Sequence, residues 1–361
     1  MYSFIFTDSQ QTLEAEGVQD SWGSVAEALS SGASLVVGAL PFHPEETPAL
    51  FAPQSFSFRR GAPELPTGKL PEVHDIAEMT SRGEHANRVE QAVSQIRSGK
   101  FQKLVLSREE RYLLAAQPSP EVLLGSFLTG SGTGHGHLVD LGSAGHRYRG
   151  AQLIGSSPEL LIAKRGEFIE SYPLAGTIPR CPDPDEDQAR ADGLLRSGKD
   201  IAEHGFVTED IRRVLEPYCV ELKIPEVPSL TATSHTWHLG TRIRGRLKDP
   251  RVPVLELAAV LHPTPAVCGF PTPRTQQELR KVEPGRGFYA GAVGWSDAAG
   301  DGQWRVSIRS AVLQGNTVRA HAGGGIVADS DAAAEVRETV AKLGPVRAAL
   351  GLPTGDLVVA P

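Results

Sequence analysis

Three strand-like segments follow one another near the C-terminal end of the chain, with no helix between them. They are GFYAGAVGWSD (287–297), QWRVSIRSAVLQG (303–315) and NTVRAHAGGGIV (316–327). Such short connections favour antiparallel pairing, because parallel neighbours need a crossover of a dozen or more residues. Similar strand patterns occupy 101–109, 134–141, 151–166, 167–176 and 234–247.

Long helical patterns separate these groups of strands. They occupy 84–100, 185–217, 252–263 and 331–350, and the second has a predicted break near Ser197–Gly198. Strands in hairpin groups with helices between the groups predict an α/β protein of the α+β type, rather than a regular βαβ alternation. No G-x-G-x-x-G or P-loop motif follows a strand, which argues against a Rossmann unit.

Composition excludes several classes of partner. The 361 residues carry a net charge of −7, which argues against a nucleic-acid partner. No apolar run is long enough for a membrane span, and MYSFIFTDSQ lacks the features of a signal peptide. Cys181, Cys219 and Cys268 are too few and scattered for a disulfide framework or zinc site. We therefore expect a cytoplasmic protein, with Cys268 as a buried structural thiol.

The last helical segment carries charged residues on one face. Glu335, Glu338 and Lys342 are three and four residues apart, a spacing that aligns them along a helix. Adjacent carboxylates repel and gain nothing without a cation. For this stripe alone, a surface ion pair between Lys342 and Glu338 is the simpler explanation.

A second stripe strengthens the case for a metal. In SGKDIAEH (197–204), Asp200 and Glu203 are also three residues apart. Two helices with a carboxylate pair each could meet over one Mg²⁺, which prefers oxygen ligands. Alternatively Ser197 and Asp200 form a capping box, and both roles can hold together.

The glycine run in HAGGGIV precedes the last helix. Glycines let backbone N–H groups approach an anion, and a helix N-terminus favours negative charge. Gly323 and Gly325 are therefore candidate ligand-binding positions in a predicted loop. The alternative is a crowded strand turn.

Three further charged residues lie within strand-like segments. In an alternating strand Arg309 shares a face with Arg305 and Ser307, and could bind a carboxylate through two hydrogen bonds. Lys103 is flanked by apolar residues, where a desolvated lysine can act as a base. Glu159 stands between a proline and leucines, which suits a general acid. Taken alone, each of these is more often an ordinary charged residue of a strand. Taken together with the two carboxylate stripes, they predict a magnesium-assisted site for a small dicarboxylated anion.

Nine blocks of sequence resemble the chorismate-utilising enzymes, in the order in which that family has them. They are KLVLSRE (103–109), GSSPELL (155–161), YPLAGTIPR (172–180), KDIAEH (199–204), WHLGTRIRGRL (237–247), LHPTPAVCGFPT (261–272), GFYAGAVGWSD (287–297), WRVSIRSA (304–311) and HAGGGIVADSDAAAEVRETVAKL (321–343). They span about three quarters of the chain, and within the family they most resemble isochorismate synthases.

The resemblance implies a fold and a reaction. The fold is a single large domain with antiparallel sheets packed face to face and helices outside. Residues 1–80 would be an N-terminal part of it, and 81–352 the chorismate-binding catalytic region. The reaction is the reversible, Mg²⁺-dependent conversion of chorismate to isochorismate: water attacks C2 of the ring and the C4 hydroxyl leaves. The resemblance also favours a monomer.

The resemblance also implies roles for individual residues. Lys103 falls at the position of the base that activates water, and Glu159 at that of the general acid. Glu203 and Glu338 match direct magnesium ligands, and Asp200 and Glu335 match positions that hold the metal's waters. The expected substrate-binding residues are Gly176, Thr177, His238, Tyr289, Arg309, Gly323, Gly325 and Lys342, with a supporting role for His238.

The chain departs from the family pattern at several points. Asp200 replaces the glutamate of some relatives, Gly324 replaces the usual alanine, and TIPR follows PLAG in an unfamiliar form. Three alternatives remain open: a salicylate synthase that goes on to eliminate pyruvate, an amine-transferring synthase, and a catalytically silent chorismate-binding protein. Lys103 argues against the amine-transferring enzymes, which resemble this chain but have glutamine there. The sequence does not indicate whether the product would supply menaquinone, siderophore or antibiotic biosynthesis.

Overall fold

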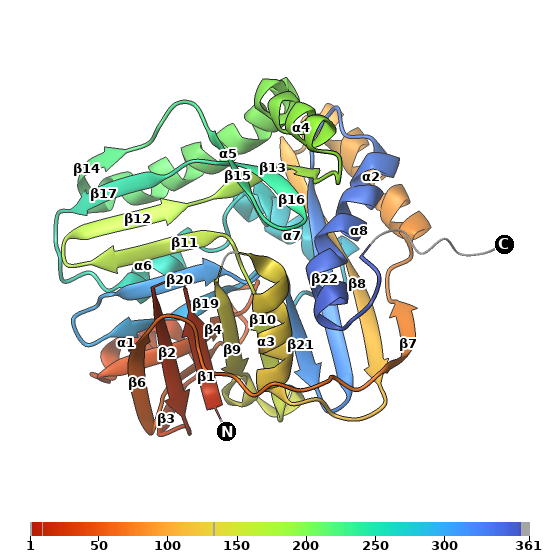
Figure 1. Ribbon diagram of the computed structural model, residues 1–361. Coiled ribbons are helices and arrows are strands. Elements are labelled where there is room, and N and C mark those ends of the chain that lie inside the picture. The colour runs from red at the N-terminus through yellow and green to blue at the C-terminus, as the bar shows by residue number, and fades with distance from the viewer. Residues whose placement is uncertain (1, 9, 133, 355–361) are drawn as a thin grey trace.

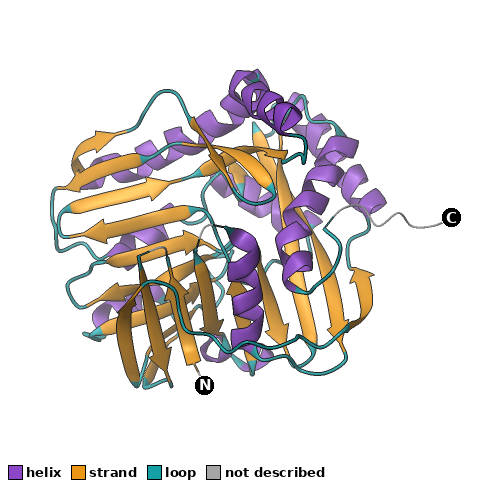
Figure 2. Ribbon diagram, viewed as in Figure 1, coloured by secondary structure: helices purple, strands orange, loops and turns teal. Residues whose placement is uncertain are grey.

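The computed structural model describes residues 2–8, 10–132 and 134–354 of the chain. Within these residues, three antiparallel β-sheets and eight α-helices form the fold (Figure 1; Figure 2). The α+β class, with antiparallel sheets and helices outside, is confirmed. No helix among the described residues is long and apolar enough to cross a membrane.

The largest sheet contains ten strands. They are β1 (Tyr2–Thr7), β2 (Gln11–Glu16), β6 (Ser55–Arg60), β7 (Val73–Glu78), β8 (Lys103–Leu114), β9 (Gly136–Asp140), β10 (Ala151–Gly155), β18 (Gly269–Phe270), β21 (Ser310–Gln314) and β22 (Thr317–Ile326). Their order is β18-β8-β22-β21-β10-β9-β1-β2-β6, and β7 also pairs with β8. The sheet therefore places the start of β8 beside the glycine run of β22.

Two further sheets complete the strands. The nine-stranded sheet contains β3 (Asp20–Trp22), β4 (Leu35–Leu40), β5 (Ala49–Ala52), β11 (Leu160–Arg165), β12 (Phe168–Tyr172), β14 (Cys219–Lys223), β17 (Ile243–Leu247), β19 (Ala292–Asp297) and β20 (Gly302–Val306). The small sheet contains β13 (Leu174–Pro179), β15 (Ser229–Ala232) and β16 (Thr236–Gly240). Strands from the first 60 residues extend both larger sheets. The division into an N-terminal part (1–80) and a catalytic region (81–352) stays a prediction.

Helices cover the outside of the sheets. They are α1 (Val25–Ser30), α2 (Arg82–Arg97), α3 (Pro120–Ser131), α4 (Pro184–Arg196), α5 (Gly198–Leu215), α6 (Val254–Leu261), α7 (Thr272–Val282) and α8 (Ala332–Ala349). In Figure 1, α3 and α8 lie across the ten-stranded sheet. The predicted break near Ser197 is confirmed: Ser197 ends α4 and caps α5, and its hydroxyl accepts a hydrogen bond from the Asp200 N–H.

One part of the core lies between the two large sheets. Phe6 and Val139 from one sheet pack in the same buried cluster as Val37 and Phe51 from the other. Burial of such side chains is the main favourable term in folding. Cys268 is fully buried and free, as predicted.

Several predicted strand segments differ from the structure. The segments 151–166, 167–176 and 234–247 each contain residues of two strands that belong to different sheets. Residues 303–315 are not one strand, because β20 ends at Val306 and β21 begins at Ser310. Between them Arg309 has a positive φ of 53°, a conformation that interrupts an extended strand. Only the second half of 287–297 is a strand, since a turn that includes Ala290 at φ 58° precedes β19.

Candidate active site

The glycine run is part of a strand, as the pattern of 316–327 predicts, and it does not form the loop that we expected at Gly323 and Gly325. Gly323 pairs with Ser107 and Gly325 with Val105 in the β22–β8 ladder, and α8 begins only at Ala332. Glycine is needed there because side chains rest on the strand backbone. A Cβ on Gly325 would lie 2.1 Å from Glu203 Oε1, and one on Gly324 would lie 2.9 Å from Glu335 Oε2. The glycines thus allow carboxylates to approach the sheet.

The acidic cluster comprises Asp200 and Glu203 on α5 and Glu335 and Glu338 on α8. The N-terminal turns of these two helices lie close together, because Lys199 of α5 pairs with Glu335 of α8. The carboxylate of Asp200 has a raised pKa, chiefly because it is buried and also because of the Glu203 charge. Gly176, at φ 80°, lets β13 pass close by: a Cβ there would lie 3.1 Å from Asp200 Cβ.

Lysines accompany three of these acids. Lys103 Nζ lies 2.9 Å from Glu203 Oε1, and Lys342 donates to Glu338 Oε1 at 2.5 Å. Lys199, which the sequence analysis did not single out, donates to Glu335 Oε1 at 2.9 Å. Each ion pair offsets part of the repulsion between neighbouring carboxylates in the cluster.

Two polar atoms in this region have unmet bonding capacity. Glu335 is 1% exposed, and its Oε2 has no hydrogen-bond partner among the described residues. Lys103 is fully buried, and its Nζ likewise has no aligned hydrogen-bond partner there despite the nearby Glu203. Burial and the Glu338 charge raise the pKa of Glu335. Within the described residues, no three metal-binding side chains lie at metal-holding spacing.

A small cavity of about 40 Å³ adjoins the acidic cluster. Seven predicted site residues line it: Glu159, Thr177, His238, Tyr289, Arg309, Gly323 and Lys342. Lys342 joins the cavity to the cluster, because the same ammonium that pairs with Glu338 donates to the Gly323 carbonyl at 2.9 Å. All fourteen predicted residues therefore lie in or beside one site.

Glu159 is the carboxyl group that lines this cavity, and its pKa is strongly shifted. It is 2% exposed, and burial raises its pKa to about 7. A backbone hydrogen bond from Leu174 and the charges of Arg309, Lys103 and Lys342 oppose that rise. A carboxyl group with this pKa can hold or release a proton near neutral pH.

Arg309 reaches the cavity because of the break between β20 and β21. The strand alternation that we expected would have placed it on the face of Arg305 and Ser307. Its left-handed backbone instead ends the alternation, and the side chain lines the cavity. Such strained residues cost on the order of 1–3 kcal/mol and cluster at functional sites. Burial lowers the pKa of the guanidinium.

His238 is held between two hydroxyl groups. Its Nδ1 lies 2.9 Å from Thr177 Oγ1, and its Nε2 lies 2.8 Å from Thr236 Oγ1. Burial lowers its pKa well below the usual range, so the ring is neutral. Tyr289 is also buried, which raises its pKa to about 12, and it stacks on His321. Both side chains suit binding and positioning.

The sequence analysis missed part of the cavity wall. Val105, Ala266, Val267 and Ile308 also line it. Ala266 and Val267 belong to LHPTPAVCGFPT, a block that carried the family resemblance without any assigned role. Apolar side chains give no chemical signal of their own in a sequence.

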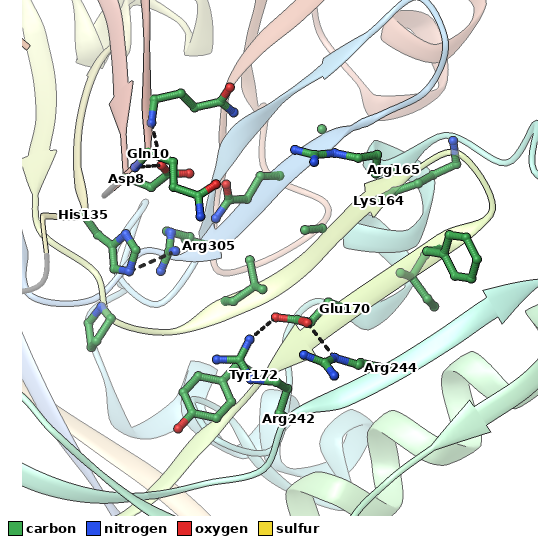
Figure 3. A pocket seen from close by; sticks show the side chains of 18 of the residues that line it. Asp8, Gln10, His135, Lys164, Arg165, Glu170, Tyr172, Arg242, Arg244 and Arg305 are labelled. Atoms are coloured by element: carbon green, nitrogen blue, oxygen red, sulfur yellow. Dashed lines mark hydrogen bonds and ion pairs between the residues drawn. The ribbon is translucent and has the colours of Figure 1, made fainter. Parts of the chain in front are cut away.

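A larger cavity, about 1030 Å³, lies elsewhere and is lined by no predicted site residue. In Figure 3, Glu170 lies between Arg242 and Arg244 and pairs with both. Pro158 and Leu174 line both cavities and so form part of the wall between them. Glu159 belongs only to the small cavity.

Known proteins with similar sequence and structure identify the family. The sequence profile of the family described as chorismate binding enzyme matches residues 55–351. A Mycobacterium tuberculosis protein provisionally named isochorismate synthase MenF is 41% identical over 97% of this chain and 96% of its own length. The isochorismate synthase DhbC of Bacillus subtilis is 40% identical, with coverages of 91% and 85%.

A solved structure agrees with this assignment. The crystal structure of Bacillus anthracis DhbC, provisionally described as a 2,3-dihydroxybenzoate-specific isochorismate synthase, superposes with a TM-score of 0.90. The two sequences are 36% identical, and the match covers 98% of this chain and 96% of that one. The chain therefore belongs to the chorismate-binding enzyme family.

Proposed function

We propose that this protein is an isochorismate synthase, which converts chorismate to isochorismate reversibly by water attack at C2 and loss of the C4 hydroxyl. The observation that carries the proposal is the meeting of Glu159, with its pKa of about 7, and the buried Lys103 at one enclosed, cationic site. The relatives named isochorismate synthase support the same reaction.

The two proton transfers fall to Lys103 and Glu159. Lys103 takes a proton from the attacking water, which is a weak nucleophile at neutral pH. Glu159 donates a proton to the departing C4 hydroxyl, because a hydroxide ion is a poor leaving group. Glu159 is buried and forms no ion pair with a described residue, which suits the acid. Lys103 must be neutral to act as the base, so its ion pair with Glu203 would have to open first, as it would if Glu203 bound the metal.

The two carboxylates of chorismate face the cationic part of the site. Arg309 and Lys342 line the cavity and provide positive charge, and the Tyr289 hydroxyl adds a hydrogen-bond donor. Arginine suits this task because its planar group can bind a carboxylate through two hydrogen bonds. Thr177 and the neutral His238 shape the wall around the ring.

The acidic cluster fits a magnesium ion. Its donors are carboxylate oxygens, the glycine strand leaves room that a Cβ would fill, and Glu335 Oε2 is buried without a partner. We assign Glu203 and Glu338 as direct ligands, and Asp200 and Glu335 as partners of the metal's waters. Bound Mg²⁺ would supply positive charge for the ring carboxylate of the substrate. Lys103, Lys199 and Lys342 supply the charge beside these acids in the structure.

The proposal is tested by incubating the purified protein with chorismate, with and without Mg²⁺, and separating the products by chromatography with mass detection. A new peak of unchanged mass that depends on Mg²⁺ is the expected result. Salicylate with pyruvate would keep the site and move the activity to pyruvate elimination. No turnover, even with ammonia supplied, would overturn the proposal. The cytoplasmic location and the monomeric state stay predictions.

A further inference from the structure

A buried ion pair lies just outside the cavity. Glu283 caps the C-terminus of α7, and Arg286 follows three residues later. Arg286 Nε donates to Glu283 Oε2 at 2.6 Å, and Nη2 donates to Oε1 at 3.0 Å. Both side chains are almost fully buried, and neither lines the cavity. Taking two charges out of water is costly, so the pair needs compensating bonds.

Arg286 uses its remaining donors on two walls of the cavity. Nη2 donates to the Val105 carbonyl at 2.6 Å, and Nη1 donates to the Val267 carbonyl at 2.7 Å. Val105 belongs to β8, whereas Val267 belongs to the segment before β18. One planar guanidinium therefore fixes the spacing between two backbone segments that both line the cavity.

Glu283 holds the same strand one step further along. Its carboxylate accepts from the Ser107 N–H at 2.6 Å and from the Ser107 hydroxyl at 3.1 Å. Alternate residues of a strand share a face, so Lys103, Val105 and Ser107 form one row. The ion pair is thus hydrogen-bonded to β8 at Val105 and Ser107, two and four residues after the proposed base Lys103.

A third wall is attached through the backbone. The Tyr289 N–H donates to the Arg286 carbonyl at 3.0 Å, which ties the turn that carries Tyr289 to the ion pair. The guanidinium also lies over the Phe42 ring, 4.3 Å from its centre. Contacts on several sides leave Arg286 little freedom to move.

We propose that Glu283 and Arg286 are a positioning pair, which sets Val105, Val267 and Tyr289 around the cavity and aligns Lys103 with the substrate without touching it. The inference rests on the proposed isochorismate synthase activity. It predicts that weakening the pair impairs the chemical step more than it impairs substrate binding, because a displaced catalytic group loses rate while the carboxylate-binding cations remain.

The test compares Arg286→Lys with a matched control, Arg347→Lys. Arg347 is also buried and binds a buried partner on β8, Glu110, through two nitrogens. Among the described residues, its side chain forms no hydrogen bond or ion pair with a residue that lines the cavity. Lysine keeps the charge, but its single nitrogen with three donors cannot reproduce the four hydrogen bonds of the planar guanidinium. Both variants are measured for kcat, for KM with chorismate, and for Tm.

For Arg286→Lys we expect kcat to fall by about 10²-fold while KM changes by less than about threefold. Arg347→Lys should keep kcat within about twofold at a comparable loss in Tm. If both variants lost kcat in proportion to their loss in Tm, or if Arg286→Lys kept its kcat, the pair would be merely structural and the proposal would fail.

A second variant covers the case in which Arg286→Lys does not fold. Glu283→Gln keeps an oxygen that can accept from Ser107 but removes the charge opposite Arg286. We expect kcat to fall by about tenfold with little change in KM. An unchanged kcat would again overturn the proposal. A wild-type protein that makes no isochorismate would instead refute the proposed function, so the two failures are distinguishable.

Discussion

The two cavities of this protein differ most in how their charges are compensated. In the large cavity of about 1030 Å³ the carboxylate of Glu170 is paired with Arg242 and Arg244 at partly exposed positions. The small cavity of about 40 Å³ encloses Glu159, which forms no ion pair with any described residue and has a pKa raised to about 7. Burial shifts pKa values at both cavities, since Arg305 of the large one also has a lowered pKa, so the distinguishing feature of the small cavity is a buried carboxyl group without an ion pair to a described residue.

The largest expected effect is on turnover when a proton-transfer group of the small cavity is removed. Lys103→Ala removes the proposed base, and Glu159→Gln removes the acid with almost no change in shape. Each should lower kcat by about 10²- to 10⁴-fold, the usual contribution of general acid–base catalysis. The measurement is initial isochorismate formation by chromatography. Largely intact activity in Lys103→Ala would mean that another group activates water.

Glu159→Gln should also change stability in a pH-dependent way. The pKa of Glu159 is raised from 4.5 to about 7 on folding, so the folded state holds the proton more tightly than the unfolded state. The free energy of unfolding of the wild type therefore falls as pH rises through this window, and the glutamine variant lacks that fall. We expect the variant to be more stable than wild type by about 3 kcal/mol above pH 7.

Below about pH 4.5 the two proteins should be equally stable, because Glu159 is then protonated in both states. Urea unfolding at several pH values measures the difference. A constant difference across this range would show that Glu159 titrates normally, and would remove the contrast between the two cavities.

Several of these features could be predicted from the sequence because they depend on local patterns. The break between α4 and α5 follows from Ser197, whose side chain is a good helix cap. The shared faces of α5 and α8 follow from residue spacing alone. The family resemblance then brought together residues as distant in the chain as Lys103 and Lys342.

The missed features depend on tertiary contacts. WRVSIRSAV alternates like a continuous strand, and nothing local indicates that Arg309 adopts a left-handed backbone. The glycines of β22 have no side chains that would distinguish a loop from a strand. Gly325 is needed because Glu203 of α5 approaches the strand too closely for a Cβ atom. The pairing of Lys199 with Glu335 joins residues 136 positions apart. Spacing along one helix cannot reveal such a partner.

A smaller effect is expected from the acidic cluster beside the small cavity. Glu338→Gln removes a proposed magnesium ligand and the partner of Lys342. We expect Mg²⁺ to bind about 10- to 100-fold more weakly, because an amide is a poorer ligand than a carboxylate for a hard cation. Isothermal titration with MgCl₂ measures this without turnover. Unchanged magnesium binding would contradict the ligand assignment, and Glu90→Gln on α2 serves as an exposed control.

The smallest effect should come from the large cavity. Glu170→Gln breaks the ion pairs with Arg242 and Arg244, which are partly exposed and so contribute on the order of 0–1 kcal/mol each. We expect kcat and KM to stay within about twofold of wild type, since the remaining charges do not reach the site of proton transfer. Steady-state kinetics with chorismate provides the measurement. A loss comparable to that of Lys103→Ala would mean that the wall at Pro158 and Leu174 transmits changes between the cavities. The pairing of Glu170 with arginines would then no longer mark the large cavity as inert.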